Sequence, residues 1–176
     1  MTEQTPPEGG PEATPLLSAF TAAMEARAGR AAPSSVSGAV ERYGWSTREL
    51  AQRMGVSERT ARRYRQQDRI PDRRAADWRE VTRQAATERQ RARITRRGLS
   101  SMNVQGQYRI SRSRYQARRD FPVRFVEGRI TGRQMREVFE ASSPAEAEKL
   151  LNDALAEAYG APGLEFEDVE GLDFTI

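Results

Sequence analysis

Residues 46–66 constrain the fold of this chain more than any other stretch of the sequence. The run Ser46-Thr47-Arg48-Glu49 is a capping box, in which the Ser46 hydroxyl accepts from the Glu49 backbone and the Glu49 side chain reaches back. The helix that it begins should end at Gly55, and Ser57 is placed to cap a second helix. The apolar residues at helical spacing along this stretch are Leu50, Ala51, Met54, Ala61 and Tyr64.

This spacing is typical of a helix-turn-helix. Ala51 has to be small because the two helices cross closely there, and Gly55 has to adopt a positive φ. Val56 and Ala61 then close the angle between the helices. Helical hairpins of other proteins match part of the same pattern, and that alternative stays open. We favour a DNA-reading helix-turn-helix over residues 46–66, because all of these positions agree at once.

The outward positions of the second helix suit contacts with base edges in the major groove. An arginine can grip guanine through O6 and N7, Gln66 can pair with adenine, and Glu58 can accept from cytosine. Thr47, Arg48 and Ser57 are better placed to contact phosphates. The second-helix side chains expected at the DNA are Ser57, Glu58, Arg59, Arg62, Arg63 and Gln66.

Charge is segregated along the chain in a way that favours a polyanionic partner. Residues 1–41 have a net charge of −3, residues 42–136 of +17 and residues 137–176 of −10. Affinity for nucleic acids comes largely from neutralising phosphates, so the basic middle is the part expected to bind. All but one of the 29 cationic residues are arginine, which suits phosphate and guanine. A GC-rich genome would also produce this excess of arginine over lysine.

The sequence predicts three parts. Residues 1–13 are rich in Pro, Gly and Glu without apolar periodicity, and should form a disordered tail. Residues 14–97 should form a helical DNA-binding domain, and residues 98–176 a C-terminal α+β module. The expected fold is mainly α with a small β element: an N-terminal helix-turn-helix domain plus a C-terminal helical module with short strands.

Three further helices are expected in residues 14–97. Thr14 should cap the first, with Pro15 at its first position, and a short second helix should run from Ser35 to Tyr43. Asp72 should cap a long third helix that runs toward Gly98. The arginines near its end that we expect to contact DNA are Arg93, Arg96 and Arg97. An exposed linker helix would be equally basic, so both interpretations stay open.

Residues 99–125 differ in character from the helices before them. Val104, Tyr108 and Ile110 alternate with polar residues and predict a short strand. Beyond it, Arg112 and Arg114 lie among aromatic and hydroxyl-bearing residues, an arrangement that can bind a nucleic-acid backbone or stack on bases. Tyr108 fits the core face of a strand equally well.

The last third should contain two helices and two short strands. The runs Thr131–Gln134 and Ser143–Glu146 are capping boxes, and the second of these helices should span Pro144–Tyr159. Alternating residues in Leu164–Phe166 and Leu172–Ile176 predict two short strands around residues 170–171. The last strand either completes a small sheet with the strand near residue 104 or adds to the sheet edge of another chain.

Two missing residue types exclude most familiar catalytic chemistry. The chain has no cysteine and no histidine, which removes thiol nucleophiles, disulfides, zinc-finger ligand sets and histidine-based triads. We therefore expect no autonomous active site, no cofactor and no metal. Runs of about 18 apolar residues and a signal-peptide pattern are also missing, so we expect a cytoplasmic, nucleoid-associated protein without a membrane partner.

The order of these parts resembles that of the telomere-protecting terminal proteins of actinomycete linear chromosomes and plasmids. The resemblance covers most of residues 40–176. The matching runs are Gly55-Val56-Ser57-Glu58-Arg59-Thr60, Gln134-Met135-Arg136-Glu137-Val138-Phe139-Glu140-Ala141, Gly163-Leu164-Glu165-Phe166-Glu167-Asp168-Val169 and Leu172-Asp173-Phe174.

The resemblance implies a DNA-binding protein primer. Proteins of this family are joined through a side-chain hydroxyl to the 5′ end of DNA, prime the patching of the terminal overhang, and work with a larger telomere-binding protein and a DNA polymerase. The hydroxyl attacks the α-phosphate of a deoxynucleotide, with metal ions supplied by the polymerase. The family uses a threonine in the region before the C-terminal helices, where this chain has Ser111 and Ser113, with Thr131 further on.

Two other functions fit the same residues. The chain would also suit a transcriptional regulator or plasmid maintenance factor that forms a homodimer through its C-terminal module and reads two half-sites. In the other alternative, the acidic C-terminal part recruits an enzyme while the basic part only anchors the protein to DNA.

Overall fold

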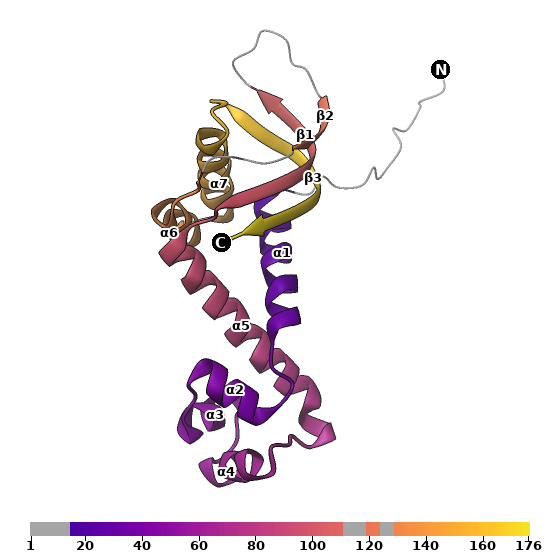
Figure 1. The fold of residues 1–176 in the computed structure, drawn as a ribbon, viewed down its shortest axis with the longest axis vertical. Helices are drawn as coiled ribbons and strands as arrows, with labels where there is room; N and C mark the ends of the chain where they lie inside the picture. Colours follow the sequence, from indigo (N-terminus) through magenta and orange to yellow (C-terminus); the bar gives the residue numbers. More distant parts are fainter. Residues whose placement is uncertain (1–14, 111–118, 124–128) are drawn as a thin grey trace, which may run out of the picture. The chain divides into compact units, whose positions relative to one another are not determined.

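A computed structural model describes residues 15–110, 119–123 and 129–176. The fold is mainly helical with a small β element, which confirms that part of the predicted fold class (Figure 1). The helices are α1 (Leu16–Ala31), α2 (Val36–Tyr43), α3 (Thr47–Met54), α4 (Glu58–Gln67), the 3₁₀ helix η1 (Asp72–Arg74), α5 (Ala75–Arg97), α6 (Gly132–Glu140) and α7 (Pro144–Ala158). The strands are β1 (Ser101–Ile110), β2 (Arg119–Val123) and β3 (Leu164–Thr175).

The contacts divide the chain into two compact units. The basic unit is Ala22–Arg93, and the sheet unit combines Ile94–Ile176 with the chain up to Thr21. Both α1 and α5 begin in one unit and end in the other. Within α5 the boundary between the units follows Arg93, four residues before the domain boundary predicted after residue 97. The start of α1 belongs to the same unit as the C-terminal part of the chain.

The core of the basic unit is built around two tryptophans. Trp45 and Trp78 meet edge to face with ring centroids 6.3 Å apart, and both are buried. The Trp78 Nε1–H donates to the Ser34 carbonyl at 3.1 Å, which satisfies its polar atom. Around them pack the predicted apolar positions of α3 and α4, namely Leu50, Ala51, Met54, Ala61 and Tyr64.

The predicted cap of α5 is wrong. Asp72 makes no capping hydrogen bond, and instead the chain enters α5 through the 3₁₀ turn η1, in which the Arg74 N–H donates to the Pro71 carbonyl at 2.8 Å. A 3₁₀ turn satisfies a terminal backbone group without a side-chain cap. The Asp72 carboxylate is exposed and lies 3.7 Å from the Arg69 guanidinium.

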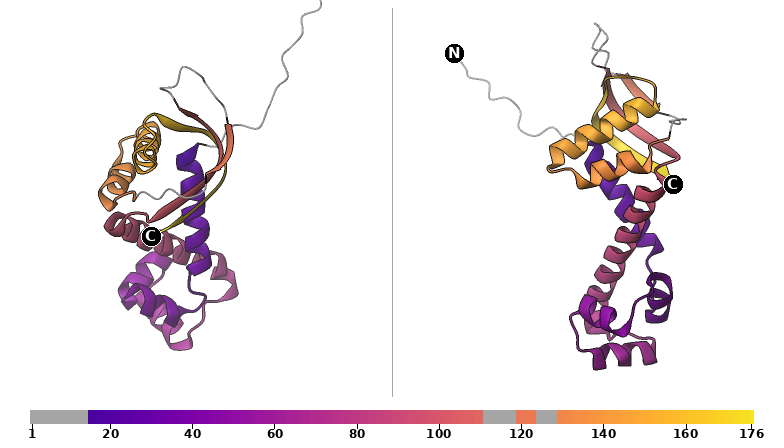
Figure 2. Two further views of the ribbon diagram at one scale, coloured as in Figure 1. Left: turned by 45° about the horizontal axis from the view of Figure 1, so that its top comes forward. Right: turned by 90° about the vertical axis from the view of Figure 1, so that its left-hand side faces the viewer.

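The sheet unit contains one antiparallel sheet in the order β2-β1-β3. β3 is a single strand, so the prediction of two short strands is wrong. In this pairing, Val104 lies opposite Leu172 and Tyr108 lies opposite Phe166. The register shifts at Gln105/Gly106 and at Gln107/Tyr108, so β3 stays paired with β1 past Glu170-Gly171. Of the two alternatives for the last strand, the structure shows the pairing with the strand near residue 104. α6 and α7 lie against one face of this sheet (Figure 2).

Aromatic contacts and hydrogen bonds join α1 to the sheet, to α6 and to α7. The ring of Phe20 lies 5.2 Å from that of Phe174 on β3 and 6.3 Å from that of Phe139 on α6. The Glu148 carboxylate accepts from the Leu16 N–H at 3.0 Å and the Leu17 N–H at 2.7 Å, so it satisfies the first donors of α1. The cap predicted at Thr14 lies outside the described residues.

The two C-terminal capping boxes differ in their outcome. Thr131 and Gln134 form the complete reciprocal box at the start of α6. Ser143 accepts from the Glu146 N–H at 3.2 Å, but the Glu146 carboxylate accepts from the backbone and hydroxyl of Ser142 instead. These bonds from Ser142 lower the pKa of Glu146. The second box is therefore only half formed.

In the part of the chain that the structure describes, none of the helices has the length and apolarity needed to cross a bilayer.

Candidate nucleic-acid interface

The α3–turn–α4 segment, residues 46–67, forms by local capping as its sequence predicts. The Ser46 hydroxyl accepts from the Glu49 N–H at 3.1 Å, and the Glu49 carboxylate accepts from the Ser46 N–H at 2.8 Å. This bond from the Ser46 backbone is the main cause that lowers the pKa of Glu49. Gly55 ends α3 with a φ of +60°, and the Val56 N–H donates to the Ala51 carbonyl at 3.0 Å. The reversal between the helices therefore favours a glycine at this position, because glycine adopts a positive φ without strain.

The buried residues of α4 determine which of its side chains face outward. Ala61 and Tyr64 are buried against the core, whereas Glu58, Arg59, Arg62, Arg63 and Gln66 are exposed. The predicted base-reading residues of α4 therefore lie outside the core. The structure brings them together on one short helix.

The arginines at the centre of this surface have no ion-pair partner among the described residues. None of the residues that the structure describes forms an ion pair with Arg59, Arg62 or Arg63. By contrast, Arg83 on α5 lies 2.9 Å from Glu80 and 3.3 Å from Glu25. The α4 surface thus keeps its positive charge available for an external anion.

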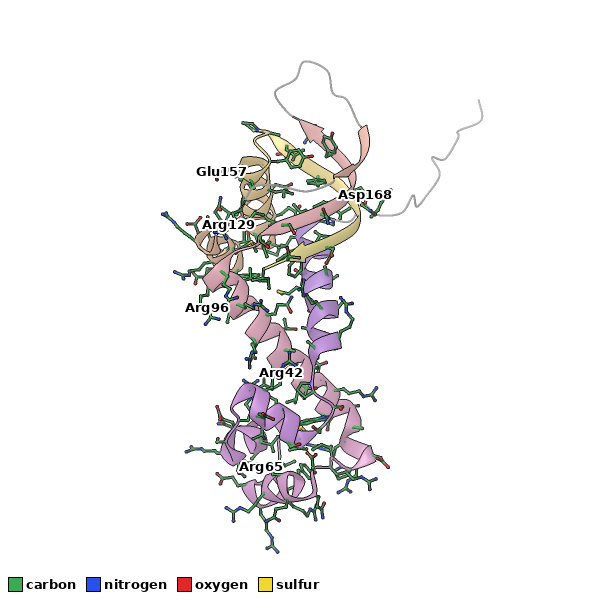
Figure 3. The ribbon with its side chains drawn as sticks, viewed as in Figure 1. Arg42, Arg65, Arg96, Arg129, Glu157 and Asp168 are labelled. Carbon is green, nitrogen blue, oxygen red and sulfur yellow. The ribbon has the colours of Figure 1, made fainter. Side chains whose placement is uncertain are left out.

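Two predicted phosphate contacts already have partners within the segment. The Thr47 hydroxyl accepts from Arg65 Nη1 at 2.8 Å, which ties α4 to the start of α3. Ser57 caps α4, since its hydroxyl accepts from the Thr60 N–H at 3.3 Å and lies 3.0 Å from Thr60 Oγ1. Arg48 is exposed. Figure 3 labels Arg65 on α4.

The predicted basic arm at the end of α5 is shared between the two units. Arg93 is exposed and belongs to the basic unit, whereas Arg96 and Arg97 are exposed in the sheet unit (Figure 3). The structure does not bring these three side chains together with the α4 arginines in one compact unit.

The candidate linking hydroxyls are only partly described. Ser111 and Ser113, with Arg112 and Arg114, lie outside the described residues in the connection between β1 and β2. Thr131 is exposed and caps α6, where its hydroxyl accepts from the Gln134 N–H at 3.2 Å and donates to Gln134 Oε1 at 2.8 Å. Its hydroxyl would have to leave this cap before it could attack a phosphate.

Sequence reasoning missed a cavity on the basic unit. It has a volume of about 350 Å³ and is lined by Tyr43, Trp45, Arg53, Ala85, Glu88 and Arg89. The closely spaced aromatics at positions 43 and 45 were the available signal, but three of the other lining residues, Ala85, Glu88 and Arg89, come from α5, about forty residues further along the chain. Within the described part of the chain, no cluster of acidic side chains could hold a metal ion.

Comparison of the chain with protein-family models, with curated proteins and with solved structures finds no match.

Proposed function

We propose that this chain is a sequence-specific DNA-binding protein in which the α3–turn–α4 segment acts as a helix-turn-helix. In this proposal α4 enters the major groove, and the start of α3 faces the phosphate backbone. The observation that carries the proposal is the exposed row of Arg59, Arg62 and Arg63 on a helix whose opposite face is buried. None of the described carboxylates forms an ion pair with an arginine of that row.

Arg63→Ala tests the reading surface. Bound sequences would first be selected from a random duplex pool, and affinities for the selected and a scrambled site would then be compared. We expect Arg63→Ala to lose about 1–3 kcal/mol of discrimination, because a bidentate contact to guanine is worth that much. Replacing both Arg96 and Arg97 with alanine should weaken binding to all sequences alike, because phosphate contacts do not depend on sequence.

Arg79→Ala is the matched control, since Arg79 is an exposed arginine on α5 outside the α3–turn–α4 segment. Equal discrimination by Arg63→Ala and Arg79→Ala would contradict the proposed reading role of α4.

We further propose, from the resemblance of the sequence, that the protein caps the 5′ ends of a linear replicon and primes end-patching synthesis. A telomere-binding protein and a DNA polymerase would be its partners, in the cytoplasm on the nucleoid. The chain would supply a hydroxyl of Ser111, Ser113 or Thr131, and the polymerase would supply the catalytic metal ions. Such a protein primer does not turn over and has no active site of its own.

Intact mass tests this role. Protein from its native host, digested exhaustively with nuclease, should retain one nucleotide, and peptide mapping should place it on Ser111, Ser113 or Thr131. An unmodified mass in material recovered with its host DNA would refute covalent attachment and leave sequence-specific binding standing. A nucleotide on any other residue would refute the assignment of the linking hydroxyl.

The alternative function is a dimeric regulator or plasmid maintenance factor. The observation that favours it is β3, a 12-residue strand at the edge of the sheet, which could pair with a second copy. Two measurements on the selected site distinguish the two roles: sedimentation counts the protein copies, and footprinting shows the bases that they cover. A symmetric footprint with two protein copies would support the regulator, whereas one copy per site would contradict it.

A further inference from the structure

The cavity on the basic unit has an aromatic wall. The rings of Tyr43 and Trp45 are 5.0 Å apart and tilted by 37°. Trp45 is only 5% exposed, whereas Tyr43 is half-buried and presents part of its ring to the cavity. Burial raises the pKa of the Tyr43 phenol, and its hydroxyl donates to the Thr82 carbonyl at 3.4 Å.

Charged side chains form the rest of the cavity wall. The Arg53 guanidinium lies 5.2 Å from the Trp45 ring centre, and its Nη2 contacts Glu88 Oε2 at 3.0 Å. Arg89 also lines the cavity. Its guanidinium donates to the Arg42 carbonyl, and the residue is exposed. Two arginines against one glutamate give the wall a net positive charge.

This combination suits a planar ring that carries an anionic group. Small-molecule sites typically have volumes of roughly 300–1,000 Å³, so a cavity of about 350 Å³ can hold one nucleotide. An aromatic face binds a base by stacking, and nearby arginines bind its phosphate. An isolated phosphate would leave the aromatic wall unused, and an apolar ligand would leave the guanidiniums without a partner.

We propose that the cavity lined by Tyr43, Arg53, Glu88 and Arg89 binds one nucleotide, either free or in an unpaired DNA strand. The base stacks on Tyr43, and Arg89 and Arg53 bind the phosphate. This site goes beyond the duplex-reading surface of α4, since the two share no residue. The protein would then hold unpaired and paired DNA at different sites of the same unit.

Glu88 gives the site a base preference. Its Oε2 binds Arg53, and its Oε1 can accept a further hydrogen bond. A carboxylate oxygen accepts from the amino group of cytosine, whereas thymine offers only a carbonyl at the same position. The site should therefore prefer cytosine over thymine.

Binding of short oligo-dC and oligo-dT to the full chain tests this proposal. We expect oligo-dC to bind more tightly, and Tyr43→Leu and Arg89→Ala each to weaken it about tenfold or more, because stacking and a phosphate contact are lost. Tyr43→Phe should bind like the wild type, since it keeps the ring. Glu88→Gln should reduce the difference between oligo-dC and oligo-dT.

Arg79→Ala is the control for the loss of one positive charge on the same helix, and it should bind oligo-dC like the wild type. Competition by dCMP with oligo-dC would show that the free nucleotide also enters the cavity, and failure of dCMP to compete would assign the site to the DNA strand. Equal losses in Arg89→Ala and Arg79→Ala, together with unchanged binding by Tyr43→Leu, would overturn the proposal.

The same variants separate this site from the proposed reading surface. Tyr43→Leu and Arg89→Ala should keep the sequence discrimination on duplex DNA, which also shows that they fold. Arg63→Ala should keep the preference for oligo-dC over oligo-dT. Loss of duplex discrimination in Tyr43→Leu or Arg89→Ala would overturn the separation of the two sites.

Discussion

At the scale of single residues, Asp68 links the end of α4 to the start of α2. It ends α4 with a φ of +46°, a conformation that Asp and Asn tolerate better than most residues. Its carboxylate accepts from the Ser37 N–H at 2.7 Å and from the Ser37 hydroxyl at 2.9 Å. The carboxylate therefore lies at the N-terminus of α2, where the helix dipole favours negative charge. One residue thus ends α4 and satisfies a backbone donor in the first turn of α2.

These bonds make the contribution of Asp68 dependent on pH. The backbone of Ser37, and then its hydroxyl, lower the pKa of Asp68 below the usual 3.8. A lowered folded pKa means that the stabilisation is complete above pH 3.8 and is lost as the pH falls through the folded value. We expect Asp68→Asn to be less stable than the wild type in urea at neutral pH, and the gap to close in acid.

Asp72→Asn is the matched control, because its carboxylate is exposed and 3.7 Å from its nearest cationic partner. It should unfold like the wild type at neutral pH. A stability gap between Asp68→Asn and the wild type that persists unchanged in acid would show that the charge of Asp68 is irrelevant.

At the scale of elements, β1 and β3 show that local sequence patterns do not predict the length of a strand. Gly106 on β1 adopts a φ of +151°, and a Cβ there would meet the backbone of Asp168 and Val169 on β3. This close approach coincides with the register shift between Gln105 and Gly106. The alternating sequence indicates extended chain on either side of residues 170–171. Only the pairing with β1 explains why β3 continues through these two residues as a single strand.

At the scale of the whole molecule, the two units carry net charges of opposite sign. Ala22–Arg93 has 17 arginines and 9 acidic residues, a net charge of +8, whereas the rest of the chain has a net charge of −4. The acidic residues of 137–176 lie in the sheet unit, where Figure 3 labels Glu157 on α7 and Asp168 on β3. The α4 arginines lie in the basic unit. The basic unit keeps a net positive charge although several of its arginines form ion pairs, and this charge can attract a polyanion.

This separation predicts a steep dependence of DNA affinity on salt. If roughly 5–8 phosphates are contacted, the affinity for duplex DNA should fall roughly a thousandfold between about 50 and 200 mM salt, because bound counterions are released. Anisotropy titrations at several salt concentrations measure this slope. Glu140→Gln, an exposed change in the sheet unit, should leave the slope unchanged. An affinity that does not respond to salt would rule out DNA as the partner.

The sequence by itself determined the features that depend on neighbours three or four residues away. The caps at Ser46, Ser57 and Thr131, the reversal at Gly55 and the outward arginines of α4 are of this kind, because a cap joins a side chain to a backbone group one turn later. The charge of each segment is likewise a property of composition.

Only the tertiary structure decided the features that join distant parts of the chain. Glu148 at the start of α1, the uninterrupted pairing of β1 with β3 and the cavity between Tyr43 and Arg89 all depend on it. Each of these contacts forms because the packing of buried side chains brings together residues that no local periodicity relates. Hydrogen bonds and charges at such contacts follow from the packing, so they become visible only when the fold is known.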